Sequence, residues 1–415
     1  PKAFEAWTRG GKGHSFLVRG ATVHPVSSSP FKGGILVRDG RIVWMGPDGD
    51  APAGEADTVV DAEGRHLYPG FVDGCDRTGI FEVGSVRGSR DDRETGKDHP
   101  DLSIASAIHG DSWHHPVTRG NGVAYVLVRP AQGRIRGQAA LIQLDGEVSP
   151  DFVVVPDLGL HIAFPRAKKP KEGKAPEEPK EVAELDDWFD RALEYAENLE
   201  AFQTAGKAFL DHDPRLEALI PYAKGEKPVL LETDSALSLM AARDWTARRG
   251  LETIYLGARD GWKIAGYLGA DRARIITGPV HALPGGKNDP YDSPFRNASI
   301  LSAAGCKVGL RTNDPEVTRN LPFQAATAAA EGWGKEAALR AITLGAAEVL
   351  GVDAFVGSLE SGKVATFFLA DGDPLDFPGH VRRMWIGGKE VDLRSKQTEL
   401  RDRYGARIER SRAER

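Results

Sequence analysis

The residues from Tyr68 to Gly79 combine an apolar segment with side chains that could do chemistry, Asp73, Cys75, Asp76 and Arg77. They read Tyr-Pro-Gly-Phe-Val-Asp-Gly-Cys-Asp-Arg-Thr-Gly. The first half is apolar and contains a Pro-Gly break, which predicts a buried strand that ends near Asp73. Cys75 and Arg77 stand two residues apart, so both side chains would point the same way if the strand continued. This is where catalytic groups would lie if the strand belonged to a barrel.

Between residues 67 and 351 short apolar segments alternate with helical patterns, which predicts a parallel α/β fold. Seven predicted strands come close to the eight of a TIM barrel, whose functional groups lie at the C-terminal ends of the strands. The predicted strands are residues 67–73, 123–129, 160–164, 229–232, 253–256, 274–277 and 307–312, and the predicted helices are residues 181–204, 236–249, 298–304, 323–331 and 335–341.

Both ends of the chain read instead as short strands with turns, such as Asp39-Gly40 between two apolar runs, a strong hairpin signal. Two segments are predicted insertions. Residues 132–156 would add strands over the barrel mouth, and residues 165–180, rich in Lys, Pro and Glu, would form a solvated, mobile loop. The charged residues after Val391 are spaced as on a solvated helix.

Composition and net charge limit the classes of protein to which this chain can belong. A chain of 415 residues fits one large barrel with a small attached domain, and 40% hydrophobic and 27% charged residues are ordinary for a globular protein. The net charge of −6 argues against a nucleic-acid surface, and no apolar run is long enough to span a bilayer. Cys75 and Cys306 are predicted at opposite ends of barrel strands, too far apart for a disulfide.

The chain resembles imidazolonepropionase-like members of the amidohydrolase superfamily over nearly its whole length. Phrases close to the family's own are residues 82–88, 319–323 and 339–351, and the terminal strands carry Gly-Ser-Leu-Glu-x-Gly-Lys-x-Ala and Asp-Gly-Asp-Pro-Leu. The resemblance implies a TIM (β/α)8 barrel over residues 67–351 and a small β-sandwich domain built from both termini, residues 14–66 and 352–395. Residues 396–415 would form a charged C-terminal tail.

The family's metal ligands are missing from this sequence. In active relatives the first strand reads Pro-Gly-Phe-Val-Asp-x-His-x-His, and the two His positions hold Cys75 and Arg77 here. The His of strand five is Glu232, the ligand position of strand six falls near Gly257, and the Asp after strand eight aligns with Asn313. The resemblance therefore implies a superfamily member without confident catalytic residues and without a metal.

Physical chemistry supports that interpretation. Hydrolysis by this route needs a metal that polarises a carbonyl and acidifies bound water. Arg offers no lone pair, and at 4 Å from a divalent ion its repulsion would be about 8 kcal/mol at an effective dielectric near 20. Asn313 can accept a hydrogen bond but cannot act as a general base. We expect Arg77 to form an ion pair with Glu232, or failing that with Asp73 or Asp314, and so to fill the former metal site.

Several alternatives remain open. A rebuilt zinc site is one, and a Cys75 nucleophile with His281 is a weaker one. Adjacent His114 and His115 would face apart and are interpreted as surface or supporting residues. A charged loop after the first strand is predicted to be an ion-paired lid. The zinc candidates are Cys75, Asp76, Glu232, Asp234, His281 and Asp314, and the loop residues are Glu82, Arg87, Arg90 and Asp91.

The sequence thus predicts a catalytically inactive amidohydrolase homologue that acts as a structural or regulatory subunit. The expected partner is a second copy or an active paralogue, with no nucleic acid and no membrane span. The alternatives are a hydrolase of carbon–nitrogen bonds in cyclic amides or peptides, with a reorganised metal site, and a small-ligand binding protein. Because relatives of this group often carry export signals, the resemblance favours a periplasmic or secreted location over a cytoplasmic one.

Overall fold

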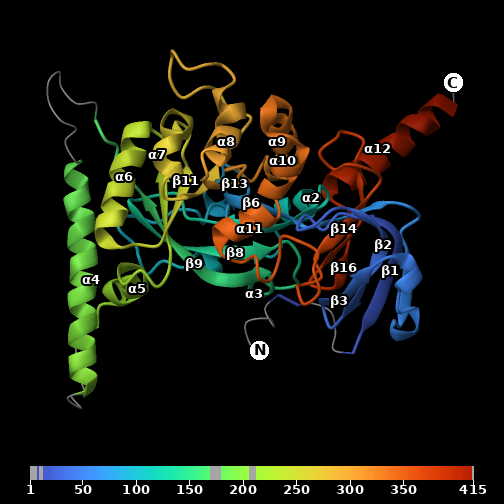
Figure 1. Ribbon diagram of the computed structural model, residues 1–415, viewed down its shortest axis with the longest axis horizontal. Helices are drawn as coiled ribbons and strands as arrows, with labels where there is room; N and C mark the ends of the chain where they lie inside the picture. The colour runs from blue at the N-terminus through green and yellow to red at the C-terminus, as the bar shows by residue number, and fades with distance from the viewer. Residues whose placement is uncertain (1–6, 9–12, 169–178, 205–211, 414–415) are drawn as a thin grey trace.

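The structure is a computed structural model that describes residues 7–8, 13–168, 179–204 and 212–413. Figure 1 shows two sheets: a central one ringed by helices, and a second one, at the right, that combines blue strands from the start of the chain with red strands from its end. The predicted loop of residues 165–180 falls largely outside the described residues.

The central sheet has eight strands in the order β13-β12-β11-β10-β9-β8-β7-β6. Neighbouring strands are parallel, except that β8 runs antiparallel to both β7 and β9. The two edge strands, β13 and β6, are also connected: Thr312, just after β13, donates its backbone N–H to Asp73 on β6 at 3.2 Å. The strands are β6 (Phe71–Asp76), β7 (Val123–Val128), β8 (Ile135–Gln143), β9 (Val153–Ala163), β10 (Val229–Thr233), β11 (Thr253–Gly257), β12 (Arg274–Thr277) and β13 (Lys307–Leu310).

This nearly closed sheet confirms the predicted TIM-like barrel, with two corrections. Residues 132–156 do not form extra strands over the mouth, because β8 is itself a barrel strand and β9 begins at Val153. The strand predicted over residues 67–73 is divided at Gly70 into two strands, β5 and β6. A Cβ at Gly70 would lie 2.6 Å from that of Ala124, so only glycine lets the chain pass between the two sheets here.

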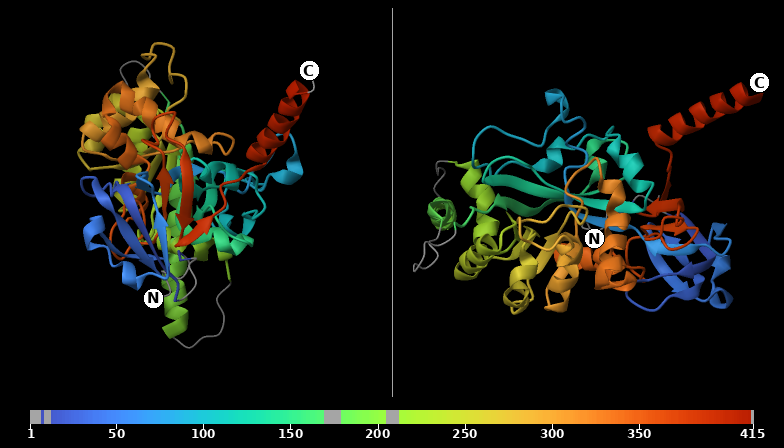
Figure 2. Two further views of the ribbon diagram at one scale, coloured as in Figure 1. Left: turned by 90° about the vertical axis from the view of Figure 1, so that its right-hand side faces the viewer. Right: turned by 90° about the horizontal axis from the view of Figure 1, so that it is seen from above.

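The helices lie around the barrel (Figure 2). Two predicted helices, α6 and α10, begin and end at the predicted residues, and α6 has a Ser235 N-cap and a left-handed Gly250 at its C-terminus. The helices are α2 (His114–Arg119), α3 (Ser149–Phe152), α4 (Lys180–Thr204), α5 (Pro214–Ala223), α6 (Ala236–Arg249), α7 (Ala265–Gly269), α8 (Ser293–Ala303), α9 (Leu321–Ala328), α10 (Lys335–Ala341), α11 (Leu344–Leu350) and α12 (Lys396–Ala413).

The second sheet joins the two ends of the chain in the order β16-β15-β14-β5-β1-β2-β3, with β4 paired to β1. The predicted Asp39-Gly40 hairpin joins β2 to β3. Stacked rings of Phe16, Phe367 and Trp385 contribute to the core of this sheet. Its strands are β1 (Ser15–Val23), β2 (Phe31–Arg38), β3 (Arg41–Gly46), β4 (Thr58–Asp61), β5 (His66–Pro69), β14 (Phe367–Ala370), β15 (Val381–Ile386) and β16 (Lys389–Val391).

The C-terminal helix α12 projects away from the rest of the molecule (Figures 1 and 2). None of its described residues is buried, as expected for the predicted solvated helix. No helix among the described residues is long and apolar enough to cross a membrane.

Candidate functional site: an arginine cage at the barrel mouth

Three arginines converge on Glu232, which lies on β10 near the C-terminal end of the strand. Arg129 directly follows β7, and its Nη2 donates to Glu232 Oε1 at 3.2 Å. Arg311 directly follows β13, and its Nη1 donates to the same oxygen at 3.2 Å. Arg136 on β8 donates through Nη1 to the other carboxylate oxygen. We call this set of four side chains the arginine cage.

The arginine cage is largely withdrawn from solvent. The side chains of Arg311 and Arg129 are 3% and 7% exposed, while those of Arg136 and Glu232 are 17% and 19% exposed. Burial by itself would raise the pKa of Glu232, but the charges of Arg129 and Arg311 outweigh it and hold that pKa well below its usual range. Glu232 is therefore a fixed carboxylate and not a titrating acid.

His161 on β9 completes the surroundings of Glu232. Burial is the main reason that its pKa falls to about 3, so the ring is neutral at physiological pH. Its Nδ1 lies 2.9 Å from the carbonyl oxygen of Pro130, which can only accept. The single proton of the neutral ring therefore belongs on Nδ1, and Nε2 is free to accept from Arg136 at 3.4 Å. The close approach of Nε2 to Glu232, at 3.2 Å, is then a contact that Arg136 bridges.

Asn313 extends the arginine cage. It has a left-handed backbone, with φ of 66°, which asparagine tolerates better than most residues. Its Oδ1 accepts from Arg129 Nη2 at 2.8 Å. Because a guanidinium group only donates, the oxygen must face Arg129, and the amide nitrogen points elsewhere.

Arg77 does not join the arginine cage, which corrects the predicted pair between Arg77 and Glu232. Its Nη1 donates to Asp92 at 2.9 Å, and Asp92 is fully buried. The fallback partner Asp314 lies 3.8 Å from Nη2, a longer contact with a half-exposed carboxylate. Phe81 stacks under the guanidinium group at 4.4 Å. Arg77 therefore pairs within the loop that follows β6 and not with Glu232 on β10.

The acidic residues of β6 are also satisfied elsewhere. Asp73 accepts from the Thr312 hydroxyl at 2.5 Å and from the Cys75 backbone N–H at 3.1 Å. Asp76 accepts from the backbone N–H and the hydroxyl of Thr78 at 2.6 and 2.8 Å. Burial raises the pKa of both carboxyl groups, and the charge of Asp76 adds to the effect on Asp73. Both carboxyl groups thus have hydrogen-bond partners other than Arg77.

The residues proposed for a rebuilt zinc site do not come together. Among the described residues no group of three or more His, Cys, Asp or Glu side chains could hold a metal ion. Cys75 is a buried free thiol whose pKa burial raises to about 11. His281 is exposed, and its Nε2 lies 2.8 Å from the Thr327 hydroxyl on α9. Neither a zinc set nor a Cys75–His281 pair is formed.

The other sequence candidates are dispersed. His115 is buried, stacks on Phe152 and has its Nε2 3.0 Å from the carbonyl oxygen of His109. His114 is half-buried, with its Nε2 3.4 Å from the carbonyl oxygen of Glu82 and 3.9 Å from the Glu82 carboxylate. In the loop after β6, Asp91 pairs with His109, and Arg90 lies 3.6 Å from Asp92. Arg87 is exposed.

The three arginines of the cage and His161 were not singled out from the sequence, although the positions of two of these arginines indicated a functional role. Arg129 ends a predicted strand and Arg311 is the last but one residue of another, close to where barrel enzymes keep functional groups. Arg136 could not be found in this way, because its strand was taken for an insertion. His161 looked like an ordinary residue of a buried strand.

No family model matches the chain. The curated imidazolonepropionase of Micrococcus luteus is 26% identical over 386 residues, covering 84% of this chain and 90% of the relative. A 5-methylthioadenosine/S-adenosylhomocysteine deaminase of Desulforudis audaxviator is 47% identical, but over only 57 residues, or 14% of this chain. The chain matches only 12% to 14% of the length of this and two other curated relatives.

Solved structures show the same fold. An amidohydrolase from Thermotoga maritima has a TM-score of 0.81 at 24% identity, covering 91% of this chain and 100% of that one. An adenosine deaminase from Xanthomonas campestris with bound zinc has a TM-score of 0.53 at 17% identity, covering 97% and 100%. Together the sequence relatives and the shared fold support the placement of the chain in the amidohydrolase superfamily.

Zinc, which the adenosine deaminase structure contains, does not fit the donor set at this mouth. Zinc binds thiolate, imidazole and carboxylate groups that present a lone pair. Here the Glu232 carboxylate already accepts from three guanidinium groups, and the nitrogen of His161 that faces it is a hydrogen-bond acceptor for Arg136.

Proposed function

We propose that this protein is a catalytically inactive member of the amidohydrolase superfamily that acts as a structural or regulatory subunit. The observation that carries the proposal is the arginine cage. Arg129, Arg136 and Arg311 surround the carboxylate that stands where the relatives' sequence motif has a metal-binding His.

The charge of the arginine cage opposes the hydrolytic chemistry of the superfamily. A metal-bound hydroxide needs a divalent ion among deprotonated ligands. At an effective dielectric near 20, each guanidinium group about 4 Å away would raise the energy of such an ion by about 8 kcal/mol, and none of the three can lose its proton. Asn313 stands where the motif has the Asp that handles the proton, and an amide cannot replace it.

Metal analysis of the purified full chain tests the inactive state. We expect far less than one zinc or iron per chain after dialysis against zinc, and no hydrolysis of cyclic amides, adenosine or dipeptides in zinc-supplemented buffer. Replacing Arg129 and Arg311 with Met should not create stoichiometric metal binding, because Cys75 is a neutral thiol and His281 lies on a separate loop. Stoichiometric metal in the unmodified chain, or metal-dependent turnover, would overturn the proposal.

The subunit role rests on the projecting helix α12. Basic residues outnumber acidic ones on α12, and Arg403, Arg407 and Arg410 are exposed. At the opposite end of the molecule α4 is acidic, with Glu194, Glu197 and Glu200 exposed (Figure 1). Charge complementarity of this kind selects partners and speeds association. We propose that α12 docks on the acidic face of α4 in a second copy, or on the equivalent helix of an active paralogue.

Light scattering at micromolar concentration and low salt tests this contact. We expect an oligomer that dissociates as salt rises, and a monomer when Arg403, Arg407 and Arg410 are changed to Glu. Mixing that variant with one in which Glu194, Glu197 and Glu200 are changed to Lys should restore association. A monomer both as purified chain and in the native extract would contradict the proposed assembly. Cell fractionation of the native source tests the proposed periplasmic or secreted location.

A further inference from the structure

The arginine cage presents N–H groups without acceptors. Arg136 uses Nε for the Gly133 carbonyl and Nη1 for Glu232, and Arg311 uses Nε for the Gly278 carbonyl and Nη1 for Glu232. The Nη2 groups of Arg136 and Arg311 have no acceptor among the residues that the structure describes. The same holds for Asn313 Nδ2 and for Arg129 Nε, and the latter is buried.

The arginine cage also carries excess positive charge. Three guanidinium groups face one carboxylate, and His161 adds no negative charge to balance them. Buried ions without a counterion are costly, so the arrangement favours a further anion. Two further acids lie on the rim: Asp234 is exposed and its charge acts on Arg311, and Asp314 is half-exposed and lies 3.8 Å from Arg77.

Gly257 brings the backbone of β11 close to one of these donors. It ends β11 with φ of 90°, and a Cβ there would lie 3.1 Å from Arg311 Nη2 and 2.5 Å from Asp234 Oδ1. Arg311 Nη2 therefore lies close to Gly257, on the side of the mouth where Asp234 stands. Solvent reaches the arginine cage, since Arg136 and Glu232 keep 17% and 19% of their side-chain surface exposed.

We propose that the arginine cage binds a small oxyanion, a carboxylate or phosphate group, through Arg136, Arg311 and the Asn313 amide. Planar guanidinium groups pair with such oxygens by charge-assisted hydrogen bonds, and Asn313 supplies a neutral donor. Glu232 holds the arginines in place, and Asp234 on the rim opposes the incoming charge. This ligand class rests on the proposed function, because a metal at the mouth would compete for the same space.

The test is calorimetric titration and thermal melting of the full chain with inorganic phosphate, malonate or acetate, with chloride at equal ionic strength as the reference. We expect a dissociation constant on the order of 1 mM or tighter for at least one oxyanion. Tighter binding of phosphate would identify a phosphate group as the ligand chemistry, and tighter binding of malonate a carboxylate.

Three variants assign the site. Arg136→Gln should weaken binding by about tenfold or more, since one charge-assisted pair is lost. Arg134→Gln is the matched control, because Arg134 precedes the same strand but pairs with Asp98 and Glu184, and it should bind as the unmodified chain does. Asp234→Asn, on the exposed rim, should tighten binding severalfold and keeps the test decisive if the Arg136 variant fails to fold.

The proposal is overturned if no oxyanion at about 10 mM binds more strongly than chloride. It is also overturned if the Arg136→Gln and Arg134→Gln variants bind oxyanions with the same affinity, or if Asp234→Asn leaves that affinity unchanged. Absence of binding in a metal-free, inactive chain would refute the oxyanion site and leave the proposed function standing. Stoichiometric metal in the same preparation would refute both.

Discussion

Replacing Glu232 with Gln tests the arginine cage most directly. Gln keeps the shape of the side chain but removes the only charged carboxylate among the three guanidinium groups. Two of the lost ion pairs are 3.2 Å long, and the Glu232 side chain is 19% exposed. We therefore assign each charge-assisted hydrogen bond about 1.5 kcal/mol, the low end of the usual range. Three such bonds predict a loss of about 4 to 5 kcal/mol, within the range of about 3–5 kcal/mol for breaking a buried pair on one side.

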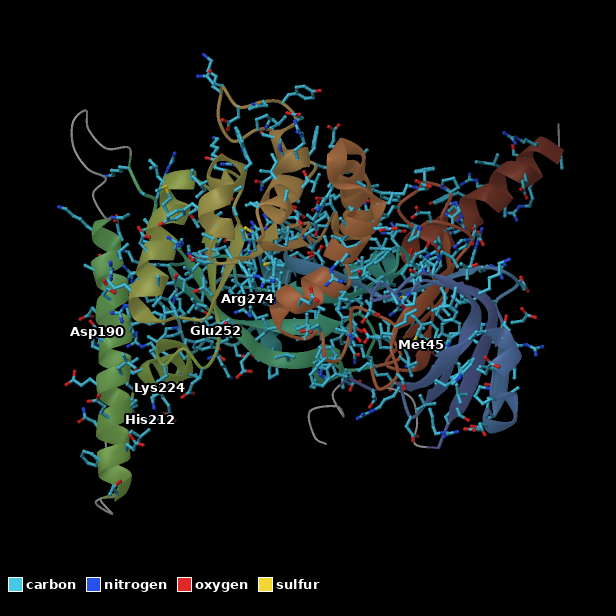
Figure 3. The ribbon with its side chains drawn as sticks, viewed as in Figure 1. Met45, Asp190, His212, Lys224, Glu252 and Arg274 are labelled. Carbon is cyan, nitrogen blue, oxygen red and sulfur yellow. The ribbon has the colours of Figure 1, made fainter. Side chains whose placement is uncertain are left out.

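A matched control lies at the other end of the barrel. Glu252 precedes β11 and pairs with Arg274 at the start of β12 (Figure 3), but its side chain is 55% exposed. Glu252→Gln should therefore cost about 1 kcal/mol or less. The assay is equilibrium urea unfolding, because urea does not screen charges as guanidinium chloride does. The double variant Glu232→Gln with Arg136→Met should recover part of the loss, because it removes one stranded charge.

The reasoning is refuted if Glu232→Gln costs no more than Glu252→Gln. It is also refuted if the double variant is less stable than the sum of its single changes predicts, because the two residues would then not act on each other as paired charges.

Further predictions concern three other sites. Arg77→Met should lower the free energy of unfolding by about 1.5–3 kcal/mol, because the buried Asp92 keeps only longer contacts; no change in urea unfolding would contradict this. Burial lowers the pKa of His115 to about 4, so below its ordinary value of 6.5 the unfolded chain binds a proton that the folded chain excludes. Between pH 7.5 and pH 4.5 His115 should thus cost about 2–3 kcal/mol of stability, a fall that His115→Phe should reduce in urea unfolding at both pH values. Burial raises the pKa of Cys75 to about 11, so its thiol should react with an aromatic disulfide reagent at neutral pH only after unfolding; rapid native labelling would contradict this.

Local pattern was enough to predict most barrel strands and several helices. The apolar runs that became β10, β11 and β12 are bounded within a residue or two, and α6 and α10 end where the pattern ends. Residue type alone also led to the prediction that a metal is absent, since Arg offers no lone pair and Asn cannot act as a general base wherever the fold places them. The hairpin at Asp39-Gly40 was likewise predicted from neighbouring residues alone.

The partner of each charge depended on the tertiary structure. In the sequence, Arg77 and Glu232 align with ligand positions of one family motif and were predicted to pair. In the structure Arg77 pairs with Asp92 in the loop after β6, and Glu232 pairs with three arginines on β8 or just after β7 and β13. Arg136 is part of the site only because β8 enters the barrel antiparallel between β7 and β9. Periodicity is a property of neighbouring residues, so the sequence by itself determined most of the strands. Ion pairing is a property of distance in space, across separations such as the 103 residues between Arg129 and Glu232, so only the folded barrel decided which charges surround Glu232.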